Sequence, residues 1–207
     1  MERRHALRDD QWEHIKGLLP GRDGHVGVTA RDNRLFVDAL LYHYRLGSPW
    51  CDLPECFGHF RAVHLRHSRW SRMGVWLRIL KILSRDADNE YAMIDATVLR
   101  AHQHSAGERG GAKQQAIGRS RGGLGGKLHA MVDVLGNPTG FHLTPGQAHD
   151  LEGADALLPQ MQVEVLIANK AYDAQERVIE LLSRAGKGVV IPSRSTNKQQ
   201  RSYDRHL

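Results

Sequence analysis

The chain has 207 residues, of which 29 are Lys or Arg, 23 are Asp or Glu, 2 are Cys and 41% are hydrophobic. This size allows a buried core and predicts a small domain followed by a larger one, and the basic balance favours a polyanionic partner. No apolar run approaches the roughly 18 residues that cross a bilayer, and the cysteines are too few for a disulfide scaffold. We therefore expect a cytoplasmic protein with no membrane partner.

Residues 1–85 have the apolar periodicity of helices and form the predicted N-terminal domain. Capping residues precede the first two segments, and Gly or Pro follows most of them. The charged stretch 85–90 is a candidate domain boundary. The predicted helices run from a cap at Asp9 or Asp10 to Leu19, from Thr29 and Asp32 to the stop at Gly47-Ser48-Pro49, from Phe60 to Arg72, and from Val75 to Leu83.

Residues 91–207 form the second predicted domain, in which strands and helices are mixed. The order of the elements predicts an α+β fold with a mixed sheet covered by helices. Asp173, with Glu176 three residues later, is the expected N-cap of the last helix. The predicted strands are Tyr91–Leu99, Lys127–Val134, Thr139–Leu143, Val163–Ala168 and Gly188–Pro192, with a turn at 135–138 and helices at Asp150–Met161 and Ala174–Ala185.

The tract between residues 101 and 126 is rich in glycine and arginine. One interpretation is a flexible loop. A compatible one is an arm that contacts phosphates, because glycine lets backbone amides approach an anion that cationic side chains attract. The cationic residues of this arm and the strand after it are candidate DNA contacts: Arg109, Lys113, Arg119, Arg121 and Lys127.

A second set of cationic residues crowds the predicted helix Phe60–Arg72, which Trp70 can anchor to the core. Such a helix could lie across phosphates or enter a major groove, as in helix-turn-helix proteins, while the alternative is a solvated positive face. The candidate DNA contacts here are Arg61, Arg66, Arg69 and Arg72.

Two strand-like segments each carry one polar residue where an apolar run ends: Asp95 in the first and Asn169 after the run Val165–Ala168. Enzymes that act on phosphodiesters hold divalent metals in this way, because hard cations need oxygen ligands fixed on a rigid element. An amide at the second position carries no charge, so Asn169 decides much of the interpretation.

Together these residues resemble the transposases of bacterial insertion sequences, in particular the group around insertion sequence five, whose catalytic domain has a ribonuclease-H-like fold. The resemblance covers essentially the whole chain. It is carried in the first domain by Leu7–Trp12, Leu18–Pro20, Asn33–Ala39, Gly47–Trp50, Asp52–Pro54, Arg69–Arg72 and Gly74–Trp76, and in the second by Ile94–Thr97, Gly126–Ala130, Leu143–Gln147 and Lys170–Asp173.

The resemblance implies cleavage and joining of DNA by an Asp, a second Asp and a Glu that hold two Mg²⁺ ions, with the terminal inverted repeats of the element as the DNA partner. Asp95 matches the first carboxylate and is the implied metal ligand. Asn169 stands where the family has its second Asp. The Glu is expected on a helix beyond a segment like Tyr203–Leu207, outside this chain.

We therefore expect a C-terminally truncated transposase that lacks its last helices, leaves one sheet face uncovered and performs no strand transfer alone. One alternative is that a frameshifted downstream frame supplies the Glu to a longer product. Another is a DNA-binding repressor of transposition, which occupies the ends of the element as a homo-oligomer or together with the full-length transposase.

Overall fold

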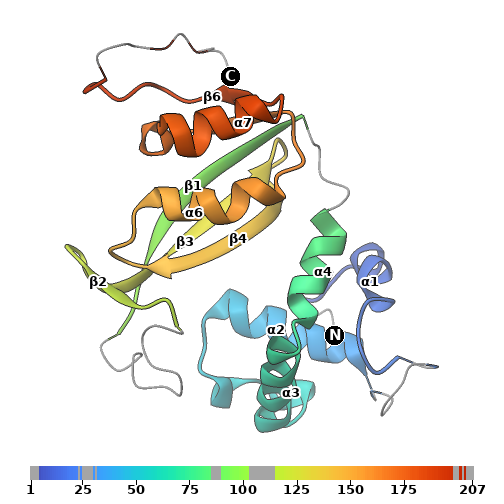
Figure 1. The fold of residues 1–207 in the computed structure, drawn as a ribbon. Helices are drawn as coiled ribbons and strands as arrows, with labels where there is room; N and C mark the ends of the chain where they lie inside the picture. Colours follow the sequence, from blue (N-terminus) through green and yellow to red (C-terminus); the bar gives the residue numbers. More distant parts are fainter. Residues whose placement is uncertain are drawn as a thin grey trace. The chain divides into compact units, whose positions relative to one another are not determined.

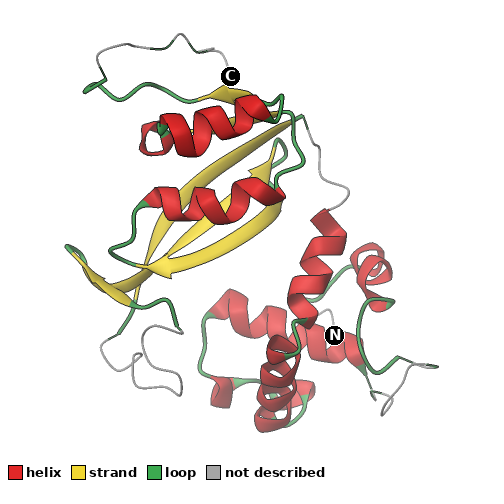
Figure 2. Ribbon diagram, in the orientation of Figure 1, coloured by secondary structure: helices red, strands yellow, loops and turns green. Residues whose placement is uncertain are grey.

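The computed structural model describes residues 5–22, 24, 30, 32–84, 90–102, 115–197, 201 and 203. They belong to two compact units, Met1–Leu83 and Ser84–Leu207. All regular structure of the first unit is helical, while the second combines a sheet with helices (Figures 1 and 2). No helix among the described residues is long and apolar enough to cross a membrane.

The third and fourth helices of the first unit have the predicted boundaries, whereas the second begins later than predicted, at Asn33 with Asp32 as its N-cap. Asp32 accepts a hydrogen bond from the backbone N–H of Leu35 at 2.8 Å, and Gly47 ends the same helix with a left-handed φ of 61°. Thr29, the expected partner of Asp32, lies outside the described residues. The helices are α1 (Asp9–Lys16), α2 (Asn33–Leu46), α3 (Phe60–Arg72) and α4 (Val75–Leu83), with short 3₁₀ turns at Trp50–Asp52 and Glu55–Phe57.

The prediction for the first helix is wrong at both ends. Its N-cap is Arg8 rather than Asp9 or Asp10, which lie in the first turn, where negative charge favours the helix. The helix ends at Lys16 with Gly17 as the C-cap, and the N–H of Leu18 bonds instead to the carbonyl of Ile15 at 2.9 Å in a tighter turn. Leu19 is buried although it lies outside the helix. Its apolar side chain therefore indicated a core position, which was mistaken for a helical one.

Aromatic residues of α2, α3 and α4 form the centre of this unit. The ring of Phe36 meets Trp70 edge-on at 5.0 Å, and Trp70 lies 5.3 Å from Trp76. Such pairs contribute about 0.5–1.5 kcal/mol beyond the area they bury. Trp70 therefore anchors α3 to the core, as the sequence predicts.

The second unit is built on a six-stranded mixed sheet, so the predicted α+β fold is confirmed. Five strands follow the order β2-β3-β1-β5-β6. The sixth, β4, lies off this path and pairs with β3. β1 is antiparallel to β3 and parallel to β5, which is parallel to β6. The strands are β1 (Tyr91–Arg100), β2 (Gly118–Ser120), β3 (Gly123–Asp133), β4 (Pro138–Pro145), β5 (Val165–Ala168) and β6 (Gly188–Val190).

One face of this sheet packs against α6 (Asp150–Leu157) and α7 (Glu180–Arg184), which lie on the same side of the strands in Figure 1. Leu166 and Tyr172 are fully buried beneath them. Gly153 of α6 lies against the buried His129, since a Cβ there would be 2.2 Å from the ring Nδ1. A glycine is thus the residue that lets α6 approach the sheet.

The opposite face of the sheet is apolar and open. Met93, Phe141 and Leu143 project from it with 39%, 47% and 52% of their surface exposed. No helix among the described residues of this unit lies over them in Figure 1. Apolar surface of this kind favours association.

The predicted flexible loop between residues 101 and 126 is wrong for its second half. Residues 118–120 form β2, and β3 begins at Gly123 rather than at Lys127. A Cβ on Gly125 would lie 2.4 Å from the carbonyl oxygen of Leu99, and one on Gly118 would lie 1.8 Å from Gln147 Oε1. These glycines therefore permit close packing and do not signal flexibility. Residues 103–114, with Arg109 and Lys113, lie outside the described residues.

Both predicted helices of this unit are shorter than expected. The helix from Asp150 ends at Leu157 and continues as a 3₁₀ turn, Leu158–Gln160, because Pro159 cannot donate the next helical hydrogen bond. The segment after Ala174 begins with a π-helical turn, Gln175–Ile179, before α7. Each of the strands β5 and β6 is also two residues shorter than predicted. β5 begins at Val165 rather than Val163, and β6 ends at Val190 rather than Pro192.

Candidate functional site

Asp95 of β1 and Asn169, which directly follows β5, lie side by side. Ile94 of β1 pairs with Ala168 of β5, so the next residue of each strand projects at the same level. The amide Nδ2 of Asn169 donates a hydrogen bond to Asp95 Oδ1 at 3.0 Å, and both residues are exposed. Asp95 is in the middle of β1, which continues to Arg100.

The amide of Asn169 is held in one orientation. Its Oδ1 accepts a hydrogen bond from the backbone N–H of Ala171 at 2.8 Å and caps the 3₁₀ turn Lys170–Tyr172. A backbone N–H can only donate, so the oxygen must face Ala171 and the NH₂ group must face Asp95. Asn169 thus joins the turn to the carboxylate of the adjacent strand.

This arrangement does not fit the pair of Mg²⁺ ions that the resemblance implies. It offers one carboxylate, and the amide oxygen that could touch a cation is already bound to Ala171. Across the part of the chain that the structure describes, no three His, Cys, Asp or Glu side chains gather where they could hold an ion.

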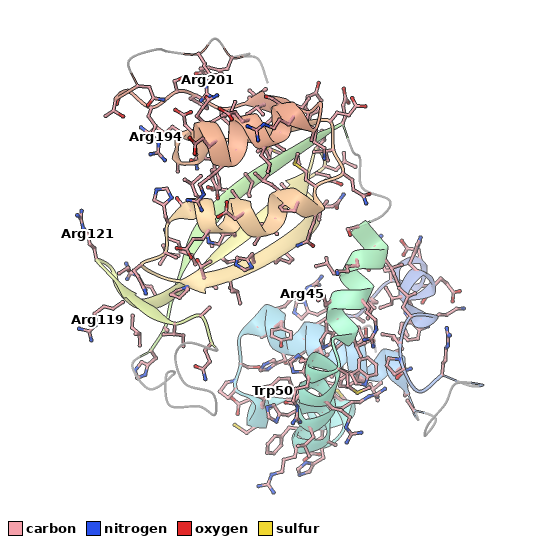
Figure 3. The ribbon with its side chains drawn as sticks, viewed as in Figure 1. Arg45, Trp50, Arg119, Arg121, Arg194 and Arg201 are labelled. Atoms are coloured by element: carbon pink, nitrogen blue, oxygen red, sulfur yellow. The ribbon has the colours of Figure 1, made fainter. Side chains whose placement is uncertain are left out.

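Asp173 belongs to a separate structural cluster, and its predicted role as an N-cap is wrong. The cap position is Ala174, while the Asp173 carboxylate is buried. It accepts hydrogen bonds from the backbone N–H of Arg194 at 2.8 Å and from Asn197 Nδ2 at 2.7 Å, and it pairs with Arg201. Figure 3 labels Arg194 and Arg201. The segment after β6 is therefore tied to the turn that carries Asn169.

Arg194 supports the same turn from its outer side. Its guanidinium donates to the carbonyl oxygens of Lys170 at 3.1 Å and Ala171 at 2.7 Å. Sequence reasoning missed this role, because it assigned no contact to Arg194. The available signal was an Asp directly after Lys-Ala-Tyr together with widely spaced arginines in the polar segment 193–207.

Tyr172 closes the inner side of the turn. Its side chain is fully buried, and its hydroxyl has no hydrogen-bond partner among the described residues. Burial raises the pKa of this hydroxyl, and the negative charges of Asp150 and Asp95 raise it further. The phenol therefore stays neutral beneath the site.

The four arginines predicted to contact DNA on α3 have different environments. Arg61, Arg69 and Arg72 are exposed. Arg66 is partly buried, with its guanidinium 4.2 Å from the Phe36 ring centre and 4.7 Å from that of Trp70. Burial lowers the pKa of the Arg66 guanidinium. Three of the four therefore face solvent on one helix, and the fourth contributes to packing.

The cationic residues near the sheet are also divided. Arg119 and Arg121 are exposed at the β2–β3 hairpin, where Figure 3 labels them. Lys127 is partly buried, and its ammonium donates to the carbonyl of Ala148 at 2.7 Å and to Asp150 at 2.8 Å.

Comparison with known proteins assigns both units. Residues 7–80 match the family described as "Putative transposase of IS4/5 family", and residues 88–206 match the transposase DDE domain. The uncharacterized protein y4sN of Sinorhizobium fredii (strain NBRC 101917 / NGR234) is 52% identical over 104 residues, which are 50% of this chain and 83% of that protein. No solved structure matches the chain. The two family matches are consecutive, and the mixed sheet agrees with them. The chain therefore belongs to the insertion-sequence transposases of the IS4/5 family.

Proposed function

We propose that this chain binds DNA as a transposase of its family and does not cut or join DNA on its own. The observation that carries the proposal is the hydrogen bond from Asn169 Nδ2 to Asp95 Oδ1, made while Ala171 holds the amide oxygen. The NH₂ group occupies the side of Asp95 on which the family's second carboxylate would share a cation.

The physical reason is charge. Two carboxylates about 4 Å apart repel each other by about 4 kcal/mol at an effective dielectric of about 20, and a shared divalent cation offsets this repulsion. With a neutral amide at position 169, Asn169 donates a hydrogen bond to Asp95, and no cation is needed to offset a repulsion between the two side chains. Asn169 therefore removes both the charge that attracts the metal and one of the oxygens that would bind it.

Binding to DNA is supported by the distribution of the basic residues. The net charge of the chain is +6, and Arg61, Arg69 and Arg72 share the exposed side of α3. Arg119 and Arg121 add a second exposed group in the other unit. These residues neutralise backbone phosphates in the proposed complex, and this contribution to affinity is independent of base sequence.

A repressor is the second candidate function. An inactive family member that keeps the α3 surface can occupy the terminal repeats of an element and exclude the active enzyme. The exposed arginines of α3 favour this candidate over a remnant with no activity at all.

The test combines binding and cleavage on labelled duplex DNA cloned from both sides of the gene. Fluorescence anisotropy should detect binding, and incubation with Mg²⁺ should leave the duplex intact. Nicking by the wild type that disappears in Asp95→Ala would refute the proposed loss of cleavage. Absence of binding at low salt would refute the proposed DNA partner.

A competition experiment separates the two candidates. Added to an active full-length relative on the same DNA ends, this chain should reduce cleavage in proportion to the fraction of ends it occupies. Binding without any reduction would reject the repressor and leave DNA binding alone.

A further inference from the structure

Three histidines surround one tryptophan in the first unit. The ring of His43 on α2 stacks on that of Trp50, with the ring centres 3.7 Å apart. His64 and His67 of α3 lie 5.1 and 5.6 Å from the same indole, which Figure 3 labels. Trp50 begins the 3₁₀ turn Trp50–Asp52, so these four residues, called here the histidine cluster, join this turn to both helices.

The histidine cluster is packed for neutral imidazole rings. His43 Nδ1 is buried and has no hydrogen-bond partner among the described residues. A proton on this nitrogen would create a buried donor without an acceptor, which is unfavourable. His67 Nε2 shares a hydrogen bond of 2.9 Å with the hydroxyl of Tyr44. Partial burial raises the pKa of that hydroxyl, so it stays neutral and offers no negative charge to a protonated ring.

Protonation of one ring opposes protonation of the others. His64 and His67 are three positions apart on α3, a spacing that brings side chains to about 5–6 Å on one helix face. Burial lowers the pKa of His67, and the positive charges of protonated His64 and His43 lower it further. The three rings therefore favour a state in which they are not all charged.

The remaining groups around His67 do not offset this repulsion. Trp76 of α4 places an uncharged indole 6.1 Å from His67. Asp52 of the 3₁₀ turn is exposed and accepts a hydrogen bond from Cys51 Sγ at 3.5 Å, and Arg45 of α2 is an exposed cation. Among the described residues, no carboxylate contributes to the charges that act on His67.

The number of rings decides the effect. A single imidazolium over the indole of Trp50 would be attracted to its π-electrons. A second and a third cation beside the same indole repel the first, and His43 and His67 are half-buried, so solvent screens this repulsion less than on an open surface. Charging the whole cluster therefore weakens its packing.

We propose that the histidine cluster makes the packing of α3 in the first unit sensitive to pH. Neutral rings hold α3 against α2 and the 3₁₀ turn, and protonation below about pH 6.5 loosens this contact. Because α3 carries the exposed Arg61, Arg69 and Arg72, pH then acts on the surface that is proposed to contact DNA. The inference itself concerns the stability of the unit and needs no DNA.

The direction of the effect follows from proton binding. The pKa of His67 is lower in the folded chain than the ordinary value of about 6.5 that applies to the unfolded chain. As the pH falls through this value, the unfolded chain binds protons that the folded chain rejects. The stability of the first unit is therefore fully present above about pH 6.5 and decreases as the pH falls below it.

The first test follows urea unfolding by tryptophan fluorescence from about pH 8 to about pH 5.5. The four tryptophans of the chain, at positions 12, 50, 70 and 76, all belong to the first unit, so the signal reports this unit within the whole protein. The unfolding constant should increase by up to about tenfold per pH unit for each proton that only the unfolded chain binds. In His67→Gln the increase should be smaller by the share of one proton. Equal pH dependence of this variant and the wild type would overturn the proposal.

The matched control is His14→Gln, the same substitution at an exposed histidine of α1. His14 Nδ1 donates to the carbonyl oxygen of Asp10 at 2.7 Å, and a proton added to the other ring nitrogen leaves this bond intact. The control should keep the pH dependence of the wild type. A control that loses as much of it as His67→Gln would show that the histidine cluster is not its source.

The second test does not depend on the folding of a variant. Ring C–H signals of the histidines are followed against pH in the ¹³C-labelled wild type, and His67 is assigned through its proximity to Tyr44 and Trp76. His67 should titrate with a midpoint below about pH 6.5. A midpoint at or above this value would overturn the proposal, whatever the chain does with DNA.

Discussion

Asp95, which contacts Asn169 at the start of the turn Lys170–Tyr172, and Asp173, which follows its end, have opposite surroundings. Asp173 is buried and receives two N–H donors and the guanidinium of Arg201, so its charge is fully matched inside the protein. Asp95 is exposed and receives one amide donor from Asn169. A buried carboxylate whose oxygens accept hydrogen bonds from several protein donors has a structural role. An exposed carboxylate with one such donor can still accept hydrogen bonds from a ligand.

Asp173→Ala should have the largest effect on stability. It leaves buried donors of Arg194 and Asn197 without an acceptor and removes the partner of Arg201. We expect a loss of about 3 kcal/mol in the free energy of unfolding, measured by urea denaturation. Asp173→Asn is the matched control and should lose about half as much, because it keeps an acceptor. A variant as stable as the wild type would show that the segment after β6 contributes nothing.

Asn169→Asp should make the exposed site resemble the family's carboxylate pair. Without metal, the added charge faces Asp95, and the hydrogen bond that spans 3.0 Å is lost. We expect a loss of about 1–2 kcal/mol in EDTA, a value reduced by solvent exposure. Millimolar Mg²⁺ should recover part of it, as seen in the melting temperature.

The control for this variant is Asn169→Ala, which also removes the hydrogen bond but adds no charge. Its melting temperature should not respond to Mg²⁺. An equal response of both variants would show that the cation acts elsewhere on the protein.

Arg194→Gln tests the outer support of the turn that separates the two carboxylates. It removes the guanidinium donors to Lys170 and Ala171, and we expect about 1 kcal/mol of destabilisation, measured by the same unfolding assay. Arg184→Gln, on an 80% exposed side chain paired with Glu180, should change stability by less than about 0.5 kcal/mol. Equal effects of the two variants would mean that the turn needs no such support.

Asp95→Ala should have a small effect on stability. The carboxylate is exposed and accepts a hydrogen bond from Asn169, so we expect a loss of less than about 1 kcal/mol by urea denaturation. A loss as large as that of Asp173→Ala would contradict the contrast between the two residues.

Much of the secondary structure could be predicted because it depends on local signals. The ends of α3 and α4 and the stop of α2 at Gly47 follow from apolar spacing and from residues that end a helix within a few positions. The sequence singled out Asp95 and Asn169 because each follows an apolar run, although Asp95 lies in the middle of β1 and Asn169 directly follows β5. Their catalytic and metal-binding roles stay predictions.

The failures concern residues whose partners are distant in the sequence. Asp173 has the pattern of an N-cap, but its donors come from Arg194, Asn197 and Arg201. Arg66 has the pattern of a surface cation, but its guanidinium packs over Phe36 and Trp70. Neither contact can be predicted from the residue spacing of a single helix or strand.

The sequence by itself determined the family, the division into helical and mixed regions, and the amide at position 169, because these depend on residue identity and short-range order. Only the tertiary structure decided which end of that amide faces Asp95, which carboxylate is buried, and why glycine occupies positions 118 and 125. Hydrogen-bond direction and close backbone approach are properties of atoms brought together from separate strands. They are therefore settled by packing and not by local pattern.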